Sequence, residues 1–561
     1  MQLNTPISTT LSIVVTVRDD RLPLWVRQTI EGLKSDGHTV RILAPDSGER
    51  GVSLLWDLPS VVLSQVPAYR LYRIFERRAG KPSIDLNERT AEPVPLDRLE
   101  QGGGCDLLLD LARRGGVASC VPRLGVLRLE IGEGRTVLDR LRSIVSGTAF
   151  PIQARLLSLD GQCKGLVRGW IPAHPFSLDR SLNRAKARLA SIVQKAVNAL
   201  ASGQELSPAK NGHEDPIVLG GASRRYLAPI AHALLRKAMA ESLRRRIERL
   251  LFVHQWALVL STDAIDGGAR GQYTIIPPAD RFWADPFPLR RDGELWLFFE
   301  EQLFGASHAR LACAKVRADG ILEGPFSVLE KPYHLSYPYL VEEGGQLYMI
   351  PESHQNKSLD LYRCTDFPTG WEKVATLVGG QECADASVVK RADGWWLFAS
   401  MRTNPGYSLS EELYAFRSDS LVSDAWKPHS GNPVATDVRN LRCAGKIFEI
   451  DGRLFRPSQD CAGGYGKAVV IHEITALAEG EFREEPRVAI PARALRGLAT
   501  LHTYNSHGAD VVIDGQLRRS RLVVLWARLL RKLGGVPAYR LAKAKGADIS
   551  ILRGLASGYY N

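Results

Sequence analysis

Three carboxylates recur at related places in the second half of the chain, and their setting suits chemistry on a sugar. Asp285 and Asp385 each begin an apolar run, and Glu352 ends one. Two carboxylates beside an anomeric carbon can drive displacement there, one attacking or deprotonating and the other holding charge. We therefore predict Asp285, Asp385 and Glu352 as catalytic residues. The structural alternative for each Asp is a turn cap at a strand start.

Other residues around these carboxylates are of types that hold sugars and phosphates. Aromatic rings stack on sugar faces, and Arg makes bidentate contacts with phosphate. The predicted substrate-binding residues are Trp283, Glu300, Tyr337, Arg402, Arg456, Asp460, His502, Tyr504 and His507. For the aromatic residues the alternative is packing, and for each Arg it is a surface position. No metal site is predicted, because His502 and His507 lack a placed carboxylate.

The elements that must position these residues are repeated hairpins. Apolar runs flank Asp292-Gly293, Gly344-Gly345, Asp393-Gly394 and Asp451-Gly452, and such dipeptides are typical of two-residue turns. A fifth copy is expected at 508–513, followed by a turn at Asp514-Gly515.

The copies begin about 50 to 60 residues apart, which is the spacing of propeller blades. We predict a five-bladed β-propeller over 256–516, because stacking blades around an axis buries faces that a single small sheet leaves open. Asp285, Tyr337, Asp385 and Ala444 should then occupy equivalent starts of the inner strands. Strand alternation should put Glu300 and Glu301 on opposite faces. The alternative is an array of hairpins without a common axis.

The first 200 residues predict an α/β domain. Strands are expected at 11–17, 39–43, 106–111, 125–131, 152–157 and 165–170, with helices at 22–33 and 184–200. The turn after the first strand lacks the glycine fingerprint of dinucleotide-binding folds, so a nicotinamide or flavin cofactor is not expected.

Two basic amphipathic segments flank the predicted propeller. Residues 201–255 comprise a linker at 201–221 and a helix at 226–253, and the tail at 517–561 begins with a second such segment at 517–531. They either brace domains with a solvated face or attach the protein to a membrane surface.

The amino-acid composition indicates what kind of protein this is and which partners suit it. The chain has 561 residues, 45% of them hydrophobic and 24% charged, with a net charge of +12. The positive charge favours anionic partners, such as phosphorylated donors or an anionic membrane face. Eight scattered Cys residues favour a reducing compartment. No secretory signal or span of about 20 apolar residues is visible, so we expect a cytoplasmic protein, peripheral on the inner face of the membrane if it binds lipid.

The propeller segment resembles the non-exostosin domain of glucosamine inositolphosphorylceramide transferases and their bacterial homologues. The matching stretches are Phe282–Phe287, His334–Tyr339, Tyr348–Glu352, Asp385–Val389, Arg456–Cys461 and Leu501–Asn505. The first and third stretches are also similar to the arabinanase, levansucrase and invertase clan of five-bladed glycosidases. That resemblance implies a nucleophile or base at Asp285 and a supporting carboxylate at Asp385.

The clan's general acid is a Glu in a later blade, where this chain has Arg442-Cys443-Ala444-Gly445. An alkoxide needs that acid in order to leave, whereas a phosphate can leave with the help of cations. Arg402, Arg442, Lys446 and Arg456 are the expected cations.

Residues 1–200 are similar to a formyltransferase-like domain. The strand that should precede the catalytic His corresponds to 125–132 and carries none. The domain is therefore expected to be degenerate, and to bind or scaffold.

Together these patterns predict a glycosyltransferase that uses a sugar nucleotide or phosphate-linked donor and a carbohydrate or glycolipid acceptor. A propeller-clan glycoside hydrolase and an inactive carbohydrate-binding scaffold are the alternatives. Nucleic acid is not an expected partner, and no other cofactor is predicted.

Overall fold

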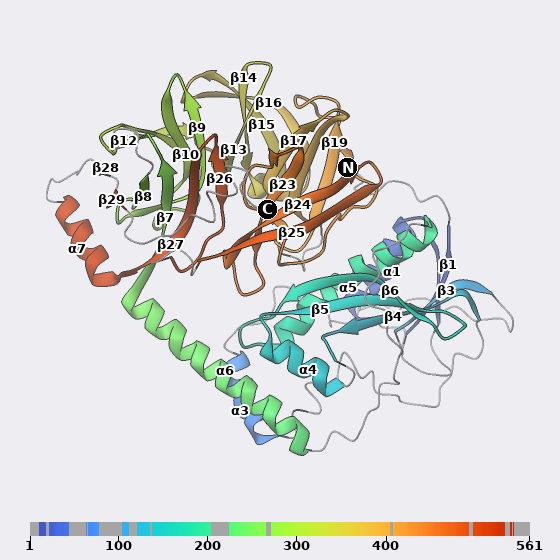
Figure 1. Cartoon of the computed structure of the whole chain (residues 1–561). Coiled ribbons are helices and arrows are strands. Elements are labelled where there is room, and N and C mark those ends of the chain that lie inside the picture. Colours follow the sequence, from blue (N-terminus) through green and yellow to red (C-terminus); the bar gives the residue numbers. More distant parts are fainter. Residues whose placement is uncertain are drawn as a thin grey trace. The chain divides into compact units, whose positions relative to one another are not determined.

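The computed structural model describes residues 10–17, 22–43, 63, 66–77, 104–111, 121–134, 137–203, 224–264, 271–403, 408–492, 498–532, 539–540 and 542–543. The chain divides into two compact units, one built mainly from residues up to 244 and one from residue 245 onward. Figure 1 shows their elements in sequence colours.

The N-terminal unit is built on a six-stranded mixed sheet. Its strand order is β2-β1-β3-β4-β5-β6, in which β1 to β4 pair in parallel and β4 to β6 pair antiparallel. The strands are β1 (Ser12–Thr16), β2 (Thr39–Leu43), β3 (Cys105–Asp110), β4 (Pro122–Ile131), β5 (Ala149–Leu157) and β6 (Cys163–Pro172). The predicted α/β class and all six predicted strands are confirmed.

Five helices complete this unit within its described residues. They are α1 (Leu24–Ser35), α3 (Pro67–Arg77), α4 (Val137–Ser146), α5 (Leu178–Ala201) and most of α6 (Arg224–Leu251). Helix α5 begins earlier than its apolar periodicity predicts, because the Ser177 side chain caps it by accepting the Arg180 N–H at 3.1 Å. The predicted linker at 201–221 lies almost wholly outside the described residues.

The segment 125–132, which lacks the catalytic His expected of a formyltransferase, lies on β4. Its Glu130 is buried and pairs with Arg140 at 3.0 Å. Burial raises the pKa of Glu130, but the guanidinium of Arg140 and its neighbours outweigh burial and lower it. The resemblance of this unit to formyltransferases stays a prediction.

The C-terminal unit is a five-bladed β-propeller, as predicted. Each blade is an antiparallel sheet whose strands follow one another in the chain, apart from the last blade. The first blade contains β9 (Arg281–Arg291), β10 (Glu294–Leu303), β11 (Arg310–Val316) and β12 (Ile321–Leu329). The second contains β13 (Ser336–Glu343), β14 (Gln346–Glu352), β15 (Ser358–Asp366) and β16 (Gly370–Gly379). The third contains β17 (Glu382–Arg391), β18 (Gly394–Arg402), β19 (Leu413–Ser418) and β20 (Lys427–Pro428). Short strands β28 (Tyr539–Arg540) and β29 (Ala542–Lys543) pair with β12 and β8.

The fourth and fifth blades complete the ring. The fourth contains β21 (Arg442–Cys443), β22 (Phe448–Ile450), β23 (Arg453–Asp460), β24 (Ala468–Ala478) and β25 (Glu481–Pro491). The fifth joins the two ends of the unit, because β26 (Tyr504–His507) and β27 (Asp510–Ser520) combine with β7 (Phe252–Thr262) and β8 (Gly271–Ile275). Strand β27 pairs with β7 from Val511–Ser261 to Ser520–Phe252, which closes the ring with backbone hydrogen bonds.

Tight turns link the first two strands of the blades. Asp292-Gly293, Gly344-Gly345 and Asp451-Gly452 have positive φ at both positions, as a type I′ turn requires. Three of the predicted hairpin turns are therefore in place. In the third blade Arg391 pairs with Gly394, so the turn residues are Ala392 and Asp393, one residue before the predicted Asp393-Gly394.

The fifth predicted copy is wrong in register. The hairpin turn is at Gly508-Ala509, and Asp514-Gly515 lies inside β27 rather than in a turn. A Cβ on Gly515 would lie 2.6 Å from the Thr500 carbonyl oxygen, so this glycine serves close packing. The predicted tail helix also starts later: Leu517 to Ser520 belong to β27, and α7 spans Arg521–Lys532.

Candidate functional site

The first three blades carry the same distortion where the inner strand begins. Asp285, Tyr337 and Asp385 have φ values of 49°, 49° and 47°, in the left-handed region. The pairing with the second strand shifts at each of them, so each lies in a β-bulge. Such a conformation costs a non-glycine residue about 1 kcal/mol or more, and it occurs mainly at functional sites.

Each bulged side chain reaches into a neighbouring blade. Asp285 contacts the fifth blade, Tyr337 the third, and Asp385 the fourth. Ala444 holds the corresponding place in the fourth blade, where its N–H binds the Pro457 carbonyl at 3.0 Å. The predicted equivalence holds for Asp285, Tyr337 and Asp385, whereas Ala444 precedes its hairpin turn by the same number of residues but lacks the left-handed conformation.

The first cluster at the axis is centred on His502. Its Nε2 lies 3.0 Å from Asp285 Oδ1, and its Nδ1 lies 2.9 Å from Asp514 Oδ1. Thr503 Oγ1 donates to Asp285 at 2.9 Å, and the Asp285 N–H donates to Asp514 at 2.9 Å. An imidazolium thus bridges two buried carboxylates.

The charges of this cluster follow from its contacts. Burial lowers the pKa of His502, but Asp514 and Asp285 outweigh burial and raise it well above the usual range. Burial raises the pKa of Asp285, but the charge and hydrogen bond of His502 outweigh burial and lower it. Asp285 is therefore an ionised carboxylate near neutral pH.

These three groups also have donor types suited to a cation. One ligand atom from each of Asp285, His502 and Asp514 lies within 4.8 Å of the others. An ion bound through one nitrogen of His502 would displace the proton on that nitrogen. As they stand, the contacts hold the imidazolium between two carboxylates, an arrangement that we call the His502 relay.

The second cluster is centred on Arg442. Its Nε donates to Asp385 Oδ2 at 2.5 Å, and its Nη2 donates to Glu352 Oε2 at 3.1 Å. Gln459 Nε2 donates to Asp385 at 2.9 Å, and His354 Nδ1 lies 2.8 Å from Glu352 Oε1. The charge of Glu352 acts on Asp285 and that of Asp285 acts on Asp385, so the two clusters adjoin where the inner strands begin, the end of the propeller that we call the mouth.

The two carboxyl groups of this cluster share one guanidinium. Burial raises the pKa of Glu352, but Arg442 and the hydrogen bond of His354 outweigh burial and lower it. Burial raises the pKa of Asp385 well above its usual range, and the Glu352 carboxylate adds to this rise while Arg442 opposes it. Glu352 is thus the ionised partner of Arg442.

Glu300 differs from the carboxylates at matching places in other blades. Glu352, at the end of β14, and Asp514, inside β27, each accept the backbone N–H of a bulged Asp in the next blade. Within the described part of the chain, the Glu300 carboxyl accepts no hydrogen bond, and His334 Nε2 lies 3.5 Å from it. Burial, followed by the Asp285 carboxylate, raises the pKa of Glu300 well above its usual range. Glu300 is therefore a protonated acid beside an ionised Asp285.

His334 and His354 lie side by side at this mouth, with ring centroids 5.9 Å apart. His334 Nδ1 accepts the Ala309 N–H at 3.3 Å, so the neutral ring carries its proton on Nε2, toward Glu300. Burial lowers the pKa of His334, which keeps the ring neutral. Tyr465 is 45% exposed, and Arg442 lies over its ring at 5.1 Å.

The predicted aromatic contacts are instead part of the core. Trp283 is fully buried and donates from Nε1 to Glu301 at 2.9 Å, and Tyr337 and Tyr504 are buried as well. The aromatic rings near His502 are Trp256, with centroids 4.2 Å apart, and Tyr465, at 5.1 Å. Glu301 faces away from the axis to Arg281 and Arg310, as the alternation with Glu300 predicts.

The predicted phosphate-binding cations are already paired or lie elsewhere. Arg456 is fully buried and forms a bidentate pair with Glu484, at 2.9 and 2.7 Å, so a donor phosphate cannot reach it. Arg402 pairs with Glu382 at the rim of the mouth. Lys446 contacts neither cluster: its N–H donates to Asn505 Oδ1 at 2.8 Å, and burial lowers its pKa to about 8.

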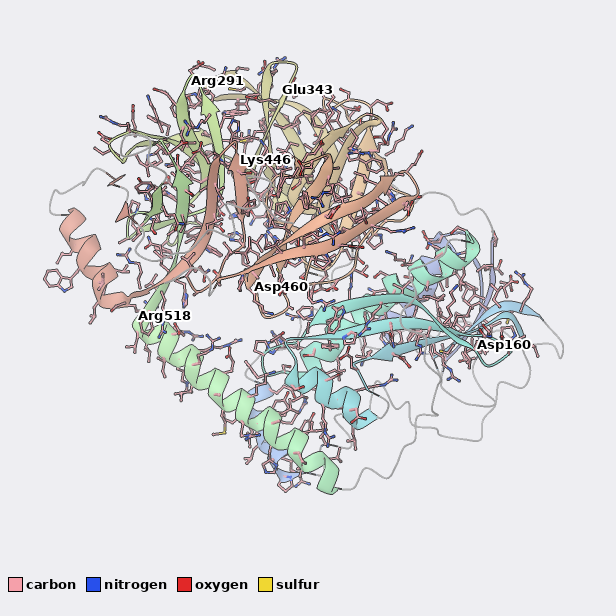
Figure 2. All side chains as sticks on the ribbon, viewed as in Figure 1. Asp160, Arg291, Glu343, Lys446, Asp460 and Arg518 are labelled. Carbon is pink, nitrogen blue, oxygen red and sulfur yellow. The ribbon has the colours of Figure 1, made fainter. Side chains whose placement is uncertain are left out.

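His507 and Asp460 also stand outside the two clusters. His507 ends β26, about 16 Å along an extended strand from His502, at the end of the axis near Lys446. Asp460 lies at the end of β23 next to Gln459 and pairs with Lys467 at 3.3 Å. Lys446 and Asp460 are labelled in Figure 2, well apart on the propeller.

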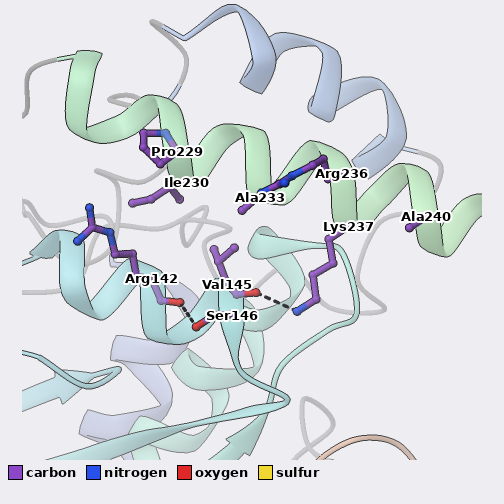
Figure 3. A pocket seen from close by; sticks show the side chains of 9 residues that line it. All are labelled: Arg142, Val145, Ser146, Pro229, Ile230, Ala233, Arg236, Lys237 and Ala240. Atoms are coloured by element: carbon purple, nitrogen blue, oxygen red, sulfur yellow. Dashed lines mark hydrogen bonds between the residues drawn. The ribbon is translucent and has the colours of Figure 1, made fainter.

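A separate cavity of about 540 Å³ lies in the N-terminal unit, between α4 and α6. Its wall includes Val145, Ile230 and Ala233, with Arg142 and Arg236 at its edge (Figure 3). Lys237 Nζ donates to the Val145 carbonyl at 2.8 Å. It thereby satisfies one of the last carbonyl groups of α4, which have no partner within the helix. This contact is structural and assigns the cavity no ligand.

The propeller is the part of the chain that matches a known protein family. Residues 274–514 match the family described as "Glucosamine inositolphosphorylceramide transferase 1, N-terminal". A protein of rice (Oryza sativa subsp. japonica) named glucosamine inositolphosphorylceramide transferase 1 is 34% identical over 208 residues, which are 36% of this chain and 28% of that protein. The Arabidopsis thaliana protein of the same name is 33% identical over 206 residues, or 36% of this chain and 27% of its own length. The chain thus spans less than a third of these curated relatives.

Solved structures with a related arrangement include two glycosidases. The family 117 glycoside hydrolase Zg3597 of Zobellia galactanivorans covers 47% of this chain and 90% of its own, with 8% identity and a TM-score of 0.33. An α-L-arabinanase of Cellvibrio cellulosa in complex with arabinohexaose covers 41% of this chain and 91% of its own, with 14% identity and a TM-score of 0.30. Likeness at this level carries no argument about mechanism.

Proposed function

We propose that the propeller catalyses glycosyl transfer in glycolipid synthesis, at the site formed by the two clusters. The observation that carries the proposal is that every member of both clusters, from Asp285 to Asp514, lies within the 274–514 segment that matches the transferase family. The names of the rice and Arabidopsis relatives support an inositolphosphorylceramide-type acceptor.

The protonation states support acid-assisted displacement. Asp285, held ionised by His502, attacks the anomeric carbon or takes a proton from the acceptor hydroxyl. Glu300, held protonated by burial, donates its proton to the departing oxygen. Arg442 keeps Glu352 charged and positions Asp385.

The proposal also specifies the class of sugar donor. A nucleotide or phosphate-linked sugar remains our preferred donor, with the phosphate oxygen protonated by Glu300 rather than held by Arg456. The imidazoles of His334 and His354 supply further donors at the mouth. This arrangement replaces the cation-assisted departure expected from the sequence.

Glycoside hydrolysis is the second candidate, and a specific observation favours it. Glu300 supplies the general acid that the fourth-blade segment lacks, and an alkoxide leaving group needs such an acid. The two reactions differ in whether an acceptor hydroxyl or water receives the sugar.

One experiment separates these reactions. The full chain is incubated with a panel of nucleotide sugars and inositolphosphorylceramide in mixed micelles, and the products are analysed by mass spectrometry. Transfer predicts an acceptor heavier by one sugar residue, which forms only with donor present. Release of free sugar without such a product from nucleotide sugars or aryl glycosides would favour hydrolysis, and binding without turnover would favour a scaffold.

A further inference from the structure

Helix α7 presents apolar side chains to solvent. Leu522, Leu525, Trp526 and Leu529 are 70%, 58%, 63% and 50% exposed. Their spacing of three and four residues places them on one helical face. Val524, on the opposite side, is buried, where α7 packs on the strands that close the ring. The outward apolar stripe is therefore a feature of the folded unit.

The end of α6 continues this surface. Leu250 and Leu251 are 72% and 56% exposed. Glu248 of α6 pairs at 3.4 Å with Arg518, three residues before α7 begins, so the two helix ends share one corner of the propeller unit (Figures 1 and 2). We call the exposed residues Leu250, Leu251, Leu522, Leu525, Trp526 and Leu529 the apolar corner.

The sequence segments that carry the apolar corner are rich in cations. From Gly515 to Ala547 the sequence has nine Lys and Arg residues and no Asp or Glu. Residues 245–251 add Arg245, Arg246 and Arg249 against the single Glu248. None of the described helices has the length and hydrophobicity of a membrane-spanning segment.

We propose that the apolar corner docks this protein on an anionic lipid bilayer, with α7 lying in the plane of the interface. Leu and Trp side chains insert at the depth of the headgroups, and the flanking cations meet lipid phosphates and carboxylates. A second copy of the chain is the less suitable occupant, because it would bring two basic segments of the same sequence together. The inference rests on exposure and charge and does not depend on the proposed function.

Flotation of the full chain with lipid vesicles tests this proposal. Vesicles of phosphatidylcholine alone are compared with vesicles that also contain phosphatidylserine, at low and high salt. Each cation near an anionic surface contributes about 1 kcal/mol, so two or three engaged cations give at least about tenfold tighter binding to the anionic vesicles. High salt should weaken that binding through screening.

Two variants supply the contrast. The triple change Leu522→Ser, Leu525→Ser and Trp526→Ser should abolish flotation without changing the melting temperature, because these side chains are exposed. Val422→Ser, which changes an apolar residue 44% exposed on the third blade, should float as the unchanged protein does.

Absence of binding to anionic vesicles, or equal binding by the triple variant, would overturn the proposal. A dimer in solution that the triple variant loses would assign the surface to a second copy instead. Asp285→Asn should float normally, so the outcome is independent of catalysis.

Discussion

The carboxyl groups at the propeller axis differ in charge because their neighbours differ. Asp285 and Glu352 each contact a cation that outweighs burial, so their pKa values are lowered, whereas burial and the Asp285 carboxylate raise the pKa of Glu300 and keep it protonated. Two carboxyl groups in opposite protonation states side by side are what acid–base catalysis at a sugar requires. The site therefore depends on a few pairwise contacts at residue scale.

The His502 relay makes stability depend on pH. The pKa of His502 is raised in the folded state, so its contribution is complete below the pKa of the unfolded chain and is lost as pH rises through the folded value. We expect the free energy of unfolding to fall on the alkaline side, and urea unfolding across a pH series measures it. In His502→Gln stability should be lower at neutral pH and that alkaline decline should vanish. An unchanged decline would show that another group causes it.

Glu300 should set the alkaline limit of activity. Because its pKa lies well above the usual range, the rate should fall as pH rises through that value and the proton is lost. Glu300→Gln keeps the size of the side chain but cannot protonate the leaving group. The residual rate of this variant should therefore not fall as pH rises through that range. Initial rates against pH provide the measurement, and a Gln variant with the original profile would exclude Glu300 as the acid.

At the scale of elements, the inner strands could be predicted because the same residue types recur at the same spacing in several blades. The hairpin dipeptides and the offset from Asp285 to Trp296 recur in three blades, so fold and axial positions follow from the sequence. Asp514 was missed because Asp514-Gly515 resembles a turn, whereas that glycine is required by the approach of Thr500. Its alternation with Ile513 in an apolar run is the signal that could have revealed it.

The pairing of charges could not be predicted in the same way. Arg456 and Arg442 are both Arg residues in the fourth blade, and only the packing of neighbouring strands decides which reaches the axis. Strand β25 brings Glu484 to Arg456, and β17 brings Asp385 to Arg442. Contacts between blades depend on ring closure, which spacing along one chain does not specify.

The Arg456–Glu484 pair should matter for stability rather than donor binding. Breaking a buried pair by Arg456→Met leaves a buried carboxylate without its partner, which costs about 3–5 kcal/mol. Adding Glu484→Leu should recover much of this loss. Urea unfolding measures both variants, and the KM for donor of the folded fraction should stay unchanged. A selective rise in donor KM without loss of stability would restore the predicted phosphate contact.

At the scale of the whole molecule, the propeller is closed by segments from its two ends. Strand β7 pairs with β27 over ten residues, so both must be present for the fifth blade to form. Closure also positions His502 and Asp514 against Asp285 of the first blade. The site is thus a product of the ring as a whole.

Truncation tests this dependence. A chain of residues 245–532 keeps β7 and β8 and should unfold in one cooperative transition. A chain of residues 277–532 lacks both strands, leaves β27 as an open edge, and should lose cooperativity or aggregate. Thermal unfolding followed by circular dichroism distinguishes them, and equal cooperativity in both chains would contradict the closure argument.

The most direct test of the account is the transfer rate of Asp285→Asn. The change removes the negative charge that we propose acts at the anomeric carbon, and it keeps the size of the side chain. We predict that the rate of sugar transfer falls at least about a hundredfold, or about 2.7 kcal/mol in barrier, while circular dichroism shows a folded propeller. Asp451→Asn, in an exposed hairpin turn away from the mouth, is the matched control and should keep the full rate. A folded Asp285→Asn protein that transfers sugar at the unchanged rate would contradict the central claim.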